Sequence, residues 1–272
     1  MTMKSLITLK KSLGQNFLIN PRILDKIVKT AEISKEDIIL EVGPGTGNLT
    51  EKLAETLRQR SGQGAGRIIA IEKDRRLIEP LKEKFKNTNV EIVEGDILKF
   101  KNQILNFKDN KYKIVGNIPY YITSRFLRTI FEKWPRPKLV VLTIQKEVAQ
   151  RIVAKPPHMN LLAVSIQFFA EPKIISYISK ENFRPIPKVD SAIIKLTPRS
   201  KFYILNSKSF FNVVRAGFSQ KRKLLVSNLE KSGFNKNSLT ANFKKLGINP
   251  ESRAENLSIG EWIELSKILI IK

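Results

Sequence analysis

The sequence predicts an α/β fold: a mostly parallel β-sheet flanked by helices, followed by a smaller helical part. Five short apolar runs, each followed by a stretch with helical spacing, predict the strands: Ile38–Val42, Arg67–Ile71, Val90–Val93, Lys113–Val115 and Leu139–Ile144. These runs are apolar without alternation, which is typical of parallel strands that helices cover on both faces. From about Lys201 onward the pattern changes to helices.

Other segments complete this prediction. Apolar residues at helical spacing predict a helix over Pro21–Ala31, with Asn20 as its N-cap. The polar, glycine-rich Arg58–Gly66 predicts an exposed loop. Further strands are expected at Leu161–Ala170 and Ala192–Leu196, and helices at Phe210–Phe218 and Gln220–Leu229. We therefore expect two domains, residues 1–200 with a basic N-terminal segment and residues 201–272.

Charge and composition narrow the possible functions. Lysine and arginine total 49 against 25 acidic residues, a net charge of +24, which favours a nucleic-acid partner, with a lysine-rich composition bias as the alternative. The absence of cysteine and the single histidine, His158, exclude disulfide frameworks, thiol catalysis and multi-histidine metal sites. There is no apolar run long enough to cross a bilayer and no recognisable secretory signal. We expect a soluble, cytoplasmic protein without a metal cofactor.

A glycine-rich turn follows the first strand of the predicted sheet. In EVGPGTG, residues 41–47, the glycines let a ligand approach the backbone and the free N–H groups of the next helix. The G-x-G-x-G spacing is neither the dinucleotide pattern nor a P-loop, which disfavours pyrophosphate and triphosphate ligands. Glu72 ends the next strand and is placed to hold ribose hydroxyls. Asp96 and Ile97, after the third strand, are placed to hold an adenine. The glycine-rich turn, Glu72 and Asp96 can each also be explained as an ordinary turn or strand end. Together, at successive strand ends, they indicate a nucleoside-bearing ligand.

The segment Gly116-Asn117-Ile118-Pro119-Tyr120 follows the fourth predicted strand and suits chemistry on an adenine amine. The exocyclic nitrogen of adenine is a poor nucleophile because its lone pair is delocalised into the ring. Asn117 through its side-chain oxygen, and Ile118 or Pro119 through a main-chain carbonyl, would accept the two amine hydrogens and favour a pyramidal nitrogen. Tyr120 would stack on the base, and its face favours nearby positive charge, as on a sulfonium. A simple proline turn is the alternative.

Taken in order, these motifs resemble those of a known family. The KsgA/RsmA family of ribosomal RNA adenine dimethyltransferases is similar in LGQNFL (13–18), EVGPGTG (41–47), IEKD (71–74), GD (95–96), NIPY (117–120) and FRPIPKVDSA (183–192). FSQKRKLLVSNL (218–229) and RAENLS (253–258) extend the resemblance through the helical part. It implies a class I, Rossmann-like methyltransferase domain and a small all-helical C-terminal domain that binds RNA. The implied sheet is seven-stranded and mainly parallel, with one antiparallel edge strand.

The resemblance also implies roles for individual residues. The contacts to the methyl donor, S-adenosylmethionine, would come from Asn16, Leu18, Gly43, Gly45, Glu72, Asp96, Ile97 and Asn117. Tyr120 and Phe183 would sandwich the target adenine, with a buried core position as the alternative for Phe183. Lys221, Arg222 and Lys223 are expected to contact RNA phosphates, with a solvated helix face as the alternative.

The implied activity is the transfer of two methyl groups to each of two adjacent adenines in the 3′-terminal hairpin loop of small-subunit (16S-type) ribosomal RNA during ribosome biogenesis. The sequence leaves the oligomeric state open, and we expect a monomer. Bases in such a loop are partly unstacked, which lowers the cost of extruding one. One alternative is a macrolide-resistance enzyme that methylates one adenine of large-subunit RNA, although EVGPGTG and RAENLS disfavour it. Another is a non-catalytic RNA-binding assembly or transcription factor. Pro156–Asn160 departs from the family's usual glycine- and serine-rich stretch, and we assign its His158 no catalytic role.

Overall fold

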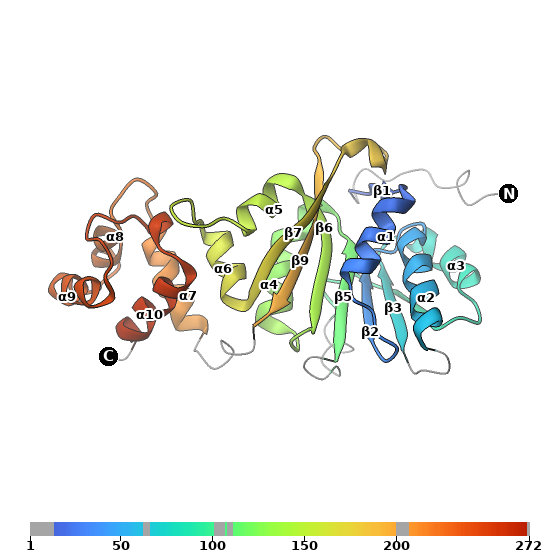
Figure 1. Ribbon diagram of the computed structural model, residues 1–272, viewed down its shortest axis with the longest axis horizontal. Helices are drawn as coiled ribbons and strands as arrows, with labels where there is room; N and C mark the ends of the chain where they lie inside the picture. The colour runs from blue at the N-terminus through green and yellow to red at the C-terminus, as the bar shows by residue number, and fades with distance from the viewer. Residues whose placement is uncertain (1–13, 62–65, 101–106, 108–110, 200–206, 271–272) are drawn as a thin grey trace. The chain divides into compact units, whose positions relative to one another are not determined.

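The computed structural model describes residues 14–61, 66–100, 107, 111–199 and 207–270 (Figure 1). The chain forms two compact units. The first comprises the residues up to Ala149 together with Lys173–Pro198, and the second comprises Gln150–Pro172 together with the residues from Arg199 onward. The two units differ from the expected domains, residues 1–200 and 201–272, mainly in one segment: residues 150–172 group with the C-terminal helices.

Seven strands form the main sheet, in the order β4-β3-β2-β5-β6-β9-β7. They are β2 (Ile38–Val42), β3 (Arg67–Glu72), β4 (Val90–Glu94), β5 (Tyr112–Asn117), β6 (Leu139–Gln145), β7 (Ala170–Ile178) and β9 (Ser191–Pro198). Strands β2 to β6 pair in parallel, and β9 runs antiparallel to β6. The predicted seven-stranded, mainly parallel sheet is confirmed. The antiparallel strand β9 lies between β6 and β7, however, and not at the edge.

Helices cover the sheet because its strands are apolar on both faces. On one face, α1 (Pro21–Thr30) and α2 (Asn48–Ser61) lie side by side in Figure 1 and share a buried core with β2, β3 and β5. Asn20 caps α1 by accepting a bond from the N–H of Arg22 (3.0 Å), which confirms that prediction. Helix α2 extends to Ser61, so the predicted loop over Arg58–Gly66 is wrong at its start. Residues 62–65 lie outside the described residues. The first unit also contains α3 (Arg75–Lys84) and α4 (Thr123–Lys133), and the boundary between the two units falls within α5 (Lys146–Ile152).

The strand order of the sheet changes side between β2 and β5: β3 and β4 lie on one side of β2, and β5 and β6 lie on the other. Strands β2 and β5 pair directly, with Val42 opposite Gly116. A Cβ atom at Gly116 would lie 2.7 Å from the carbonyl oxygen of Val42, so glycine lets the two backbones approach this closely. In open α/β sheets, ligands bind outside the carboxyl ends of the strands at such a point. The topology therefore places Gly43, after β2, beside Asn117, at the end of β5.

A second, two-stranded sheet joins two distant motifs. Strand β1 (Phe17–Leu18) pairs antiparallel with β8 (Phe183–Arg184). The N–H of Ile19 continues this contact by donating to the carbonyl of Asn182 (3.0 Å). The LGQNFL and FRPIPKVDSA motifs thus lie next to each other at the carboxyl end of the main sheet, although Leu13 itself lies outside the described residues.

The predicted strand at Leu161–Ala170 is wrong. Residues Leu161–Phe169 form helix α6, and β7 begins only at Ala170. Asn160 starts the helix by accepting a bond from the N–H of Ala163 (3.0 Å). A continuous apolar run does not distinguish a buried strand from a buried helix, and here Phe168 stacks on Phe210 of the second unit with ring centroids 4.1 Å apart.

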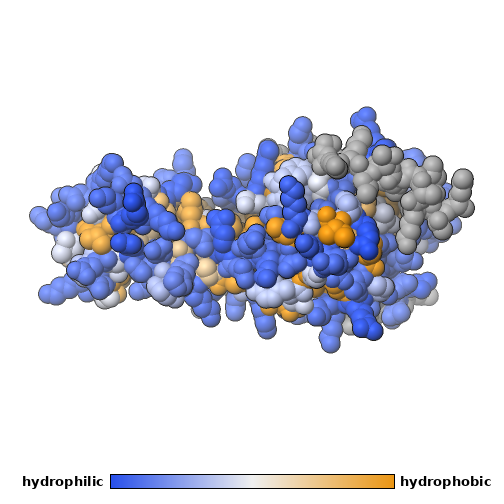
Figure 2. Space-filling view, turned by 90° about the horizontal axis from the view of Figure 1, so that it is seen from above, coloured by the Kyte–Doolittle hydropathy of each residue, from blue (hydrophilic) through white to orange (hydrophobic). Residues whose placement is uncertain are grey.

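The remaining helices of the second unit are α7 (Ser207–Gly217), α8 (Leu225–Lys231), α9 (Lys236–Leu246) and α10 (Ile259–Ile270). The prediction of a helix over Gln220–Leu229 is wrong at its start, because residues 220–224 form a turn. The buried Asn228 holds this turn by donating to the carbonyls of Gly217 (2.6 Å) and Gln220 (3.0 Å). In the part of the chain that the structure describes, every helix is too short or too polar to cross a bilayer, and hydrophilic residues dominate the face in Figure 2.

Candidate active site

One cavity opens at the carboxyl ends of β2, β3, β4 and β5, within the first unit. It encloses about 770 Å³, including the part open to solvent, which is within the usual size range of ligand pockets. The structure brings ten of the predicted site residues together in its lining: Asn16, Gly43, Gly45, Glu72, Asp96, Ile97, Asn117, Ile118, Pro119 and Tyr120. The glycine-rich turn and the Asn117–Tyr120 segment therefore face a single space.

The glycine-rich turn needs glycine for two reasons. Gly43 and Gly45 have φ angles of +68° and +60°, in the left-handed region that other residues adopt only with strain. A Cβ atom at Gly45 would also lie 2.7 Å from two ring carbons of Phe17. At Gly43 the same atom would meet only the carbonyl oxygen of Asn117, at 3.9 Å. The turn is thus packed tightly against the N-terminal segment at Gly45 and has open space at Gly43.

Glu72 lies at the end of β3 and is almost completely buried. Its carboxylate accepts three backbone N–H bonds, from Gly45 (3.0 Å), Lys73 (2.8 Å) and Asp74 (2.8 Å). Burial raises the pKa of Glu72 above its usual value, although the three N–H bonds act to lower it. A carboxylate has about four acceptor positions, so about one remains for a ligand hydroxyl. This arrangement suits the expected bond to a ribose.

Asp96 follows β4 and also has partners within the protein. Its Oδ2 pairs with Lys73 Nζ at 2.9 Å, and its Oδ1 accepts from the N–H of Leu98 at 3.0 Å. Burial would raise the pKa of Asp96, but the bonds from Lys73 and Leu98 and the charge of Lys73 hold it below its usual value. Asp96 is therefore an ionised acceptor in the cavity, and Lys73 is a neighbour that the sequence did not single out.

Asn117 is oriented by a residue from the far N-terminal side of the sequence. Its Nδ2 donates to the main-chain carbonyl of Asn16 at 2.8 Å. Among the described residues, no donor bonds its Oδ1, which leaves this oxygen for a ligand amine. The carbonyl of Pro119 accepts from the N–H of Ile122 (3.2 Å), whereas the carbonyl of Ile118 has no such partner in the described part of the chain. Ile118 is therefore the better second acceptor of the two that the sequence left open.

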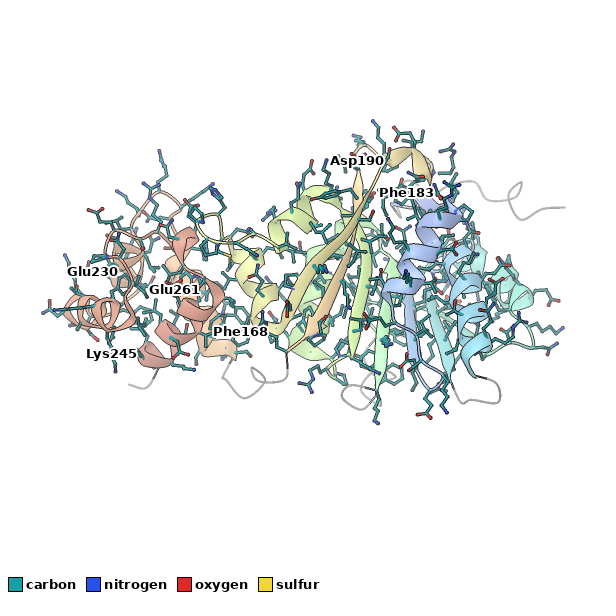
Figure 3. All side chains as sticks on the ribbon, in the orientation of Figure 1. Phe168, Phe183, Asp190, Glu230, Lys245 and Glu261 are labelled. Atoms are coloured by element: carbon teal, nitrogen blue, oxygen red, sulfur yellow. The ribbon has the colours of Figure 1, made fainter. Side chains whose placement is uncertain are left out.

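Tyr120 begins a short 3₁₀ helix and lines the cavity. Its hydroxyl is 2.6 Å from the hydroxyl of Ser191, which is fully buried at the start of β9. Ser191 is fixed by the end of β6, because it pairs with Gln145 and the preceding carbonyl of Asp190 (Figure 3) accepts from the N–H of Lys146 (3.0 Å). The ring of Tyr120 is thus tethered to the rigid sheet at its far end.

The N-terminal segment is bound to the rim of the cavity. Gln15 donates to the carboxylate of Asp74 at 2.8 Å. The side-chain bond from Arg76 is the largest cause that lowers the pKa of Asp74 to about 2, so this carboxylate stays charged. Sequence reasoning missed Gln15, Lys73, Ser191 and Tyr121, which all line the cavity or hold a residue that does. The available signal was their place inside or directly after the motifs LGQNFL, IEKD, FRPIPKVDSA and NIPY.

Two predicted ligand contacts lie away from this cavity. Phe183, labelled in Figure 3, has no exposed surface and packs in the same core as Leu24 and Ile193. Such a ring presents no free face to a base, so the core position that the sequence left open as the alternative is the observed one. Leu18 is 4% exposed, and its carbonyl accepts from Asn48 (3.2 Å) beside the glycine-rich turn. The pairing of β1 with β8 explains both positions, because it covers these side chains.

The predicted RNA contacts belong to the second unit. Lys221, Arg222 and Lys223 are exposed and lie in the turn between α7 and α8, not on a helix face. The N–H of Lys223 donates to the carbonyl of Gln220 (3.2 Å), and Asn228 fixes the same turn from within. The structure thus presents three adjacent cations on a well-held turn.

Comparison with known proteins identifies the family. A sequence profile of the family described as ribosomal RNA adenine dimethylase matches residues 7–270. Ribosomal RNA small subunit methyltransferase A from Dehalococcoides mccartyi (strain CBDB1) is 40% identical over 260 residues, which cover 94% of this chain and 87% of the relative. The crystal structure of a dimethyladenosine transferase from Plasmodium falciparum has a TM-score of 0.76 and 30% identity, covering 92% of this chain and 95% of that one. The 23S rRNA methyltransferase ErmE also has a TM-score of 0.76, with 25% identity and coverage of 94% and 100%. The resemblance seen in the motifs is confirmed, and the chain belongs to the ribosomal RNA adenine dimethylase family.

Proposed function

We propose that this protein transfers methyl groups from S-adenosylmethionine to two adjacent adenines in the 3′-terminal hairpin loop of small-subunit ribosomal RNA, two to each exocyclic amine. The observation that carries the proposal is the single cavity lined by Gly43 and Glu72 on one side and by Asn117 and Tyr120 on the other. The name of the relative from Dehalococcoides mccartyi supports the small subunit as the source of the RNA. We expect the enzyme to act as a cytoplasmic monomer without a metal.

The donor side of the cavity fits a methylated adenosine. Glu72 has an acceptor position left for ribose, and Asp96 is charged and placed at the next strand end for an adenine amine. Ile97 would pack on the adenine ring, and Asn16 lines the cavity where the methionine end is expected. When bound, S-adenosylmethionine supplies an electrophilic methyl group on a sulfonium; as this methyl joins the amine nitrogen its bond to sulfur breaks, S-adenosylhomocysteine leaves, and the amine gives up one proton to solvent.

The base side of the cavity fits the nucleophile. Asn117 Oδ1 and the carbonyl of Ile118 would accept the two hydrogens of the adenine amine, which turns the nitrogen lone pair away from the ring. The same acceptors stabilise the positive charge that develops on the nitrogen as the new bond forms. Tyr120 would stack on the base, and its tether to Ser191 holds the ring face in place. Pre-oriented acceptors of this kind need no covalent intermediate with the protein.

Affinity for RNA would come from the second unit. Phosphate contacts position a nucleic acid without reading its sequence, and Lys221, Arg222 and Lys223 provide such contacts on a held turn. The net charge of +24 predicts that binding weakens strongly as salt rises.

A second candidate is methylation of an adenine in large-subunit RNA. It is favoured by the TM-score of 0.76 to ErmE, which equals the value for the dimethyladenosine transferase. The higher identity to the small-subunit enzyme, 40% against 25%, favours the small subunit. A non-catalytic RNA-binding role is disfavoured by the acceptors that Asn117 and Ile118 keep free.

The test presents labelled S-adenosylmethionine with purified, undermethylated small subunits and, separately, with large subunits, followed by mass mapping of the methylated adenines. We expect four methyl groups on two adjacent adenines of the small-subunit RNA and none on the large subunit. Label in one adenine of large-subunit RNA would replace the proposal with the second candidate. The non-catalytic role would be supported if the protein bound RNA in a salt-sensitive way without the donor and placed no label in either subunit.

A further inference from the structure

Tyr121 stands out among the aromatic residues of the cavity. It is 59% exposed, more than any other large apolar side chain among the described residues. It lines the same cavity as Tyr120 and Asn117 and directly follows Tyr120 in the chain. The donor and base contacts assigned above leave Tyr121 without a role.

The ring of Tyr121 is supported on one side. A Cβ atom at Gly14 would lie 3.2 Å from its Cδ1 and 3.3 Å from its Cε1, so the bare α-carbon of the glycine packs against the ring. Gly14 has a φ angle of +59°, which again suits glycine. The exposed surface of Tyr121 therefore belongs to a ring that has backbone behind it and solvent in front of it.

The surroundings of Tyr121 suit a nucleotide. Lys73 lines the same cavity with a half-exposed side chain, and its ammonium group, which pairs with Asp96 at 2.9 Å, has further N–H donors for a phosphate. Exposed aromatic rings beside cations are the usual binding surface for unpaired nucleotides, because every base has a face that stacks and every nucleotide has a phosphate. Tyr120 and Tyr121 line the same cavity, so one unpaired strand that enters it can reach both rings.

We propose that Tyr121 is a second stacking platform, which holds the nucleobase next to the target adenine while that adenine lies on Tyr120. This inference rests on the proposed function and specifies its substrate as an unpaired dinucleotide. Where two adjacent adenines are both methylated, the adenine outside the pocket needs a place to lie, and Tyr121 provides it. The platform selects an unpaired strand and not a particular base, since stacking is tolerant of sequence.

The experiment compares Tyr121→Ala, Tyr121→Leu and Tyr121→Trp with the wild type. Steady-state transfer is measured with undermethylated small subunits, and the affinity for S-adenosylmethionine is measured by calorimetry. We expect the alanine and leucine variants to lose about tenfold in kcat/KM for the subunit, in line with the stacking of one base on an aromatic ring, and the tryptophan variant to keep its activity. The affinity for the donor should not change.

The matched control is Tyr177→Ala. Tyr177 is 51% exposed on β7, with Lys146 5.4 Å above its ring, and it is not among the residues that line the cavity. This variant should behave as the wild type, which separates stacking in the cavity from the general loss of an exposed tyrosine.

Subunits reconstituted with RNA that lacks the base next to the target give a second readout. The wild type should be less active on this RNA than on intact RNA. Tyr121→Ala on this RNA should be no less active than the wild type on the same RNA, because the stacking contact is already absent. Full activity of Tyr121→Leu on intact subunits, a weakened donor affinity, or additive losses on the altered RNA would overturn the proposal while leaving the methylation of the small subunit standing. If the wild type itself transfers no methyl group to small subunits, the proposed function fails and this inference fails with it.

Discussion

The two halves of the cavity are built differently. In the donor half, formed by the glycine-rich turn, Glu72 and Asp96, the acidic groups already have partners: Glu72 accepts three backbone N–H bonds, and Asp96 pairs with Lys73. In the base half, Asn117, Tyr120 and Tyr121 each have one contact that orients the side chain and one side that stays free, and Ile118 adds a main-chain carbonyl. The donor half is thus shaped mainly by backbone N–H groups at the ends of β2 and β3, and the base half by side-chain contacts between parts of the chain that lie farther apart in sequence.

This difference separates binding from chemistry. A bond that is equally strong in the bound donor and in the transition state holds the donor but does not accelerate methyl transfer. Acceptors aimed at a charge that develops during the reaction do accelerate it. Changes in the base half should therefore lower turnover, and changes in the donor half should lower stability or donor affinity.

The largest effect is expected at the centre of the base half. Asn117→Ala removes the acceptor aimed at the amine, and turnover should fall by about 10²- to 10³-fold, as for the loss of one pre-oriented hydrogen-bonding group. Methyl incorporation into undermethylated small subunits measures it. Asn242→Ala, on α9 with one side-chain bond to Ser238, is the control and should turn over normally. Normal turnover of Asn117→Ala would contradict the conclusion that the base half of the cavity controls turnover.

The next effect concerns a buried acid beneath the donor half. Burial raises the pKa of Glu41 from 4.5 to about 8, and the charge of Glu72 adds to the rise. The folded protein then holds a proton that the unfolded chain releases between these values. Stability should fall as pH rises from about 5 to 8, on the order of 1 kcal/mol per pH unit, and stay low above that range.

Glu41→Gln removes this titration while keeping the shape of the side chain. Denaturant unfolding at pH 6 and pH 9 should show a smaller loss of stability in the variant than in the wild type. Part of the slope should remain, because the pKa of Glu72 is also raised. Equal slopes in the two proteins would show that Glu41 is ionised in the folded state at neutral pH.

A third prediction compares two glycines with similar backbone angles. Gly45 and Gly247 have φ angles of +60° and +67°, but a Cβ atom clashes with Phe17 at the first and meets nothing within 4 Å at the second. Gly247→Ala should cost about 1 kcal/mol of stability through backbone strain alone. Gly45→Ala should cost more and weaken donor affinity about tenfold, or by about 1.4 kcal/mol. Calorimetry with S-adenosylmethionine measures this, and an unchanged affinity would mean that the donor half tolerates a displaced N-terminal segment.

The smallest effect is expected at the tether of Tyr120. Ser191→Ala leaves the tyrosine hydroxyl without its partner, which should cost about 1 kcal/mol, or about fivefold in kcat/KM, at unchanged donor affinity. Tyr120→Phe should give a similar loss, and the double variant should be no worse than either single variant, because one contact is removed in all three. Additive losses would mean that Ser191 acts on catalysis by another route.

Local sequence patterns predicted much of the donor half. The strand runs, the glycine-rich turn, and the acids at successive strand ends all depend on residues close together in the chain, and the structure has them in the predicted places. The same reasoning was wrong at Leu161–Phe169, where an apolar run suits a helix as well as a strand. At Phe183 it left stacking and burial both open, because the burial depends on the pairing with β1. It also did not single out Tyr121, because exposure is not visible in a motif.

By itself, therefore, the sequence determined the order of the five parallel strands along the chain and the residue types at their carboxyl ends, since periodicity and turn chemistry are local. Only the tertiary structure decided which of those groups are free to act. The bond from Asn117 to Asn16 spans 101 positions and that from Tyr120 to Ser191 spans 71. Contacts across such separations form only when the packed sheet brings the segments together, so the orientation of the free oxygen and of the aromatic faces is a property of the fold.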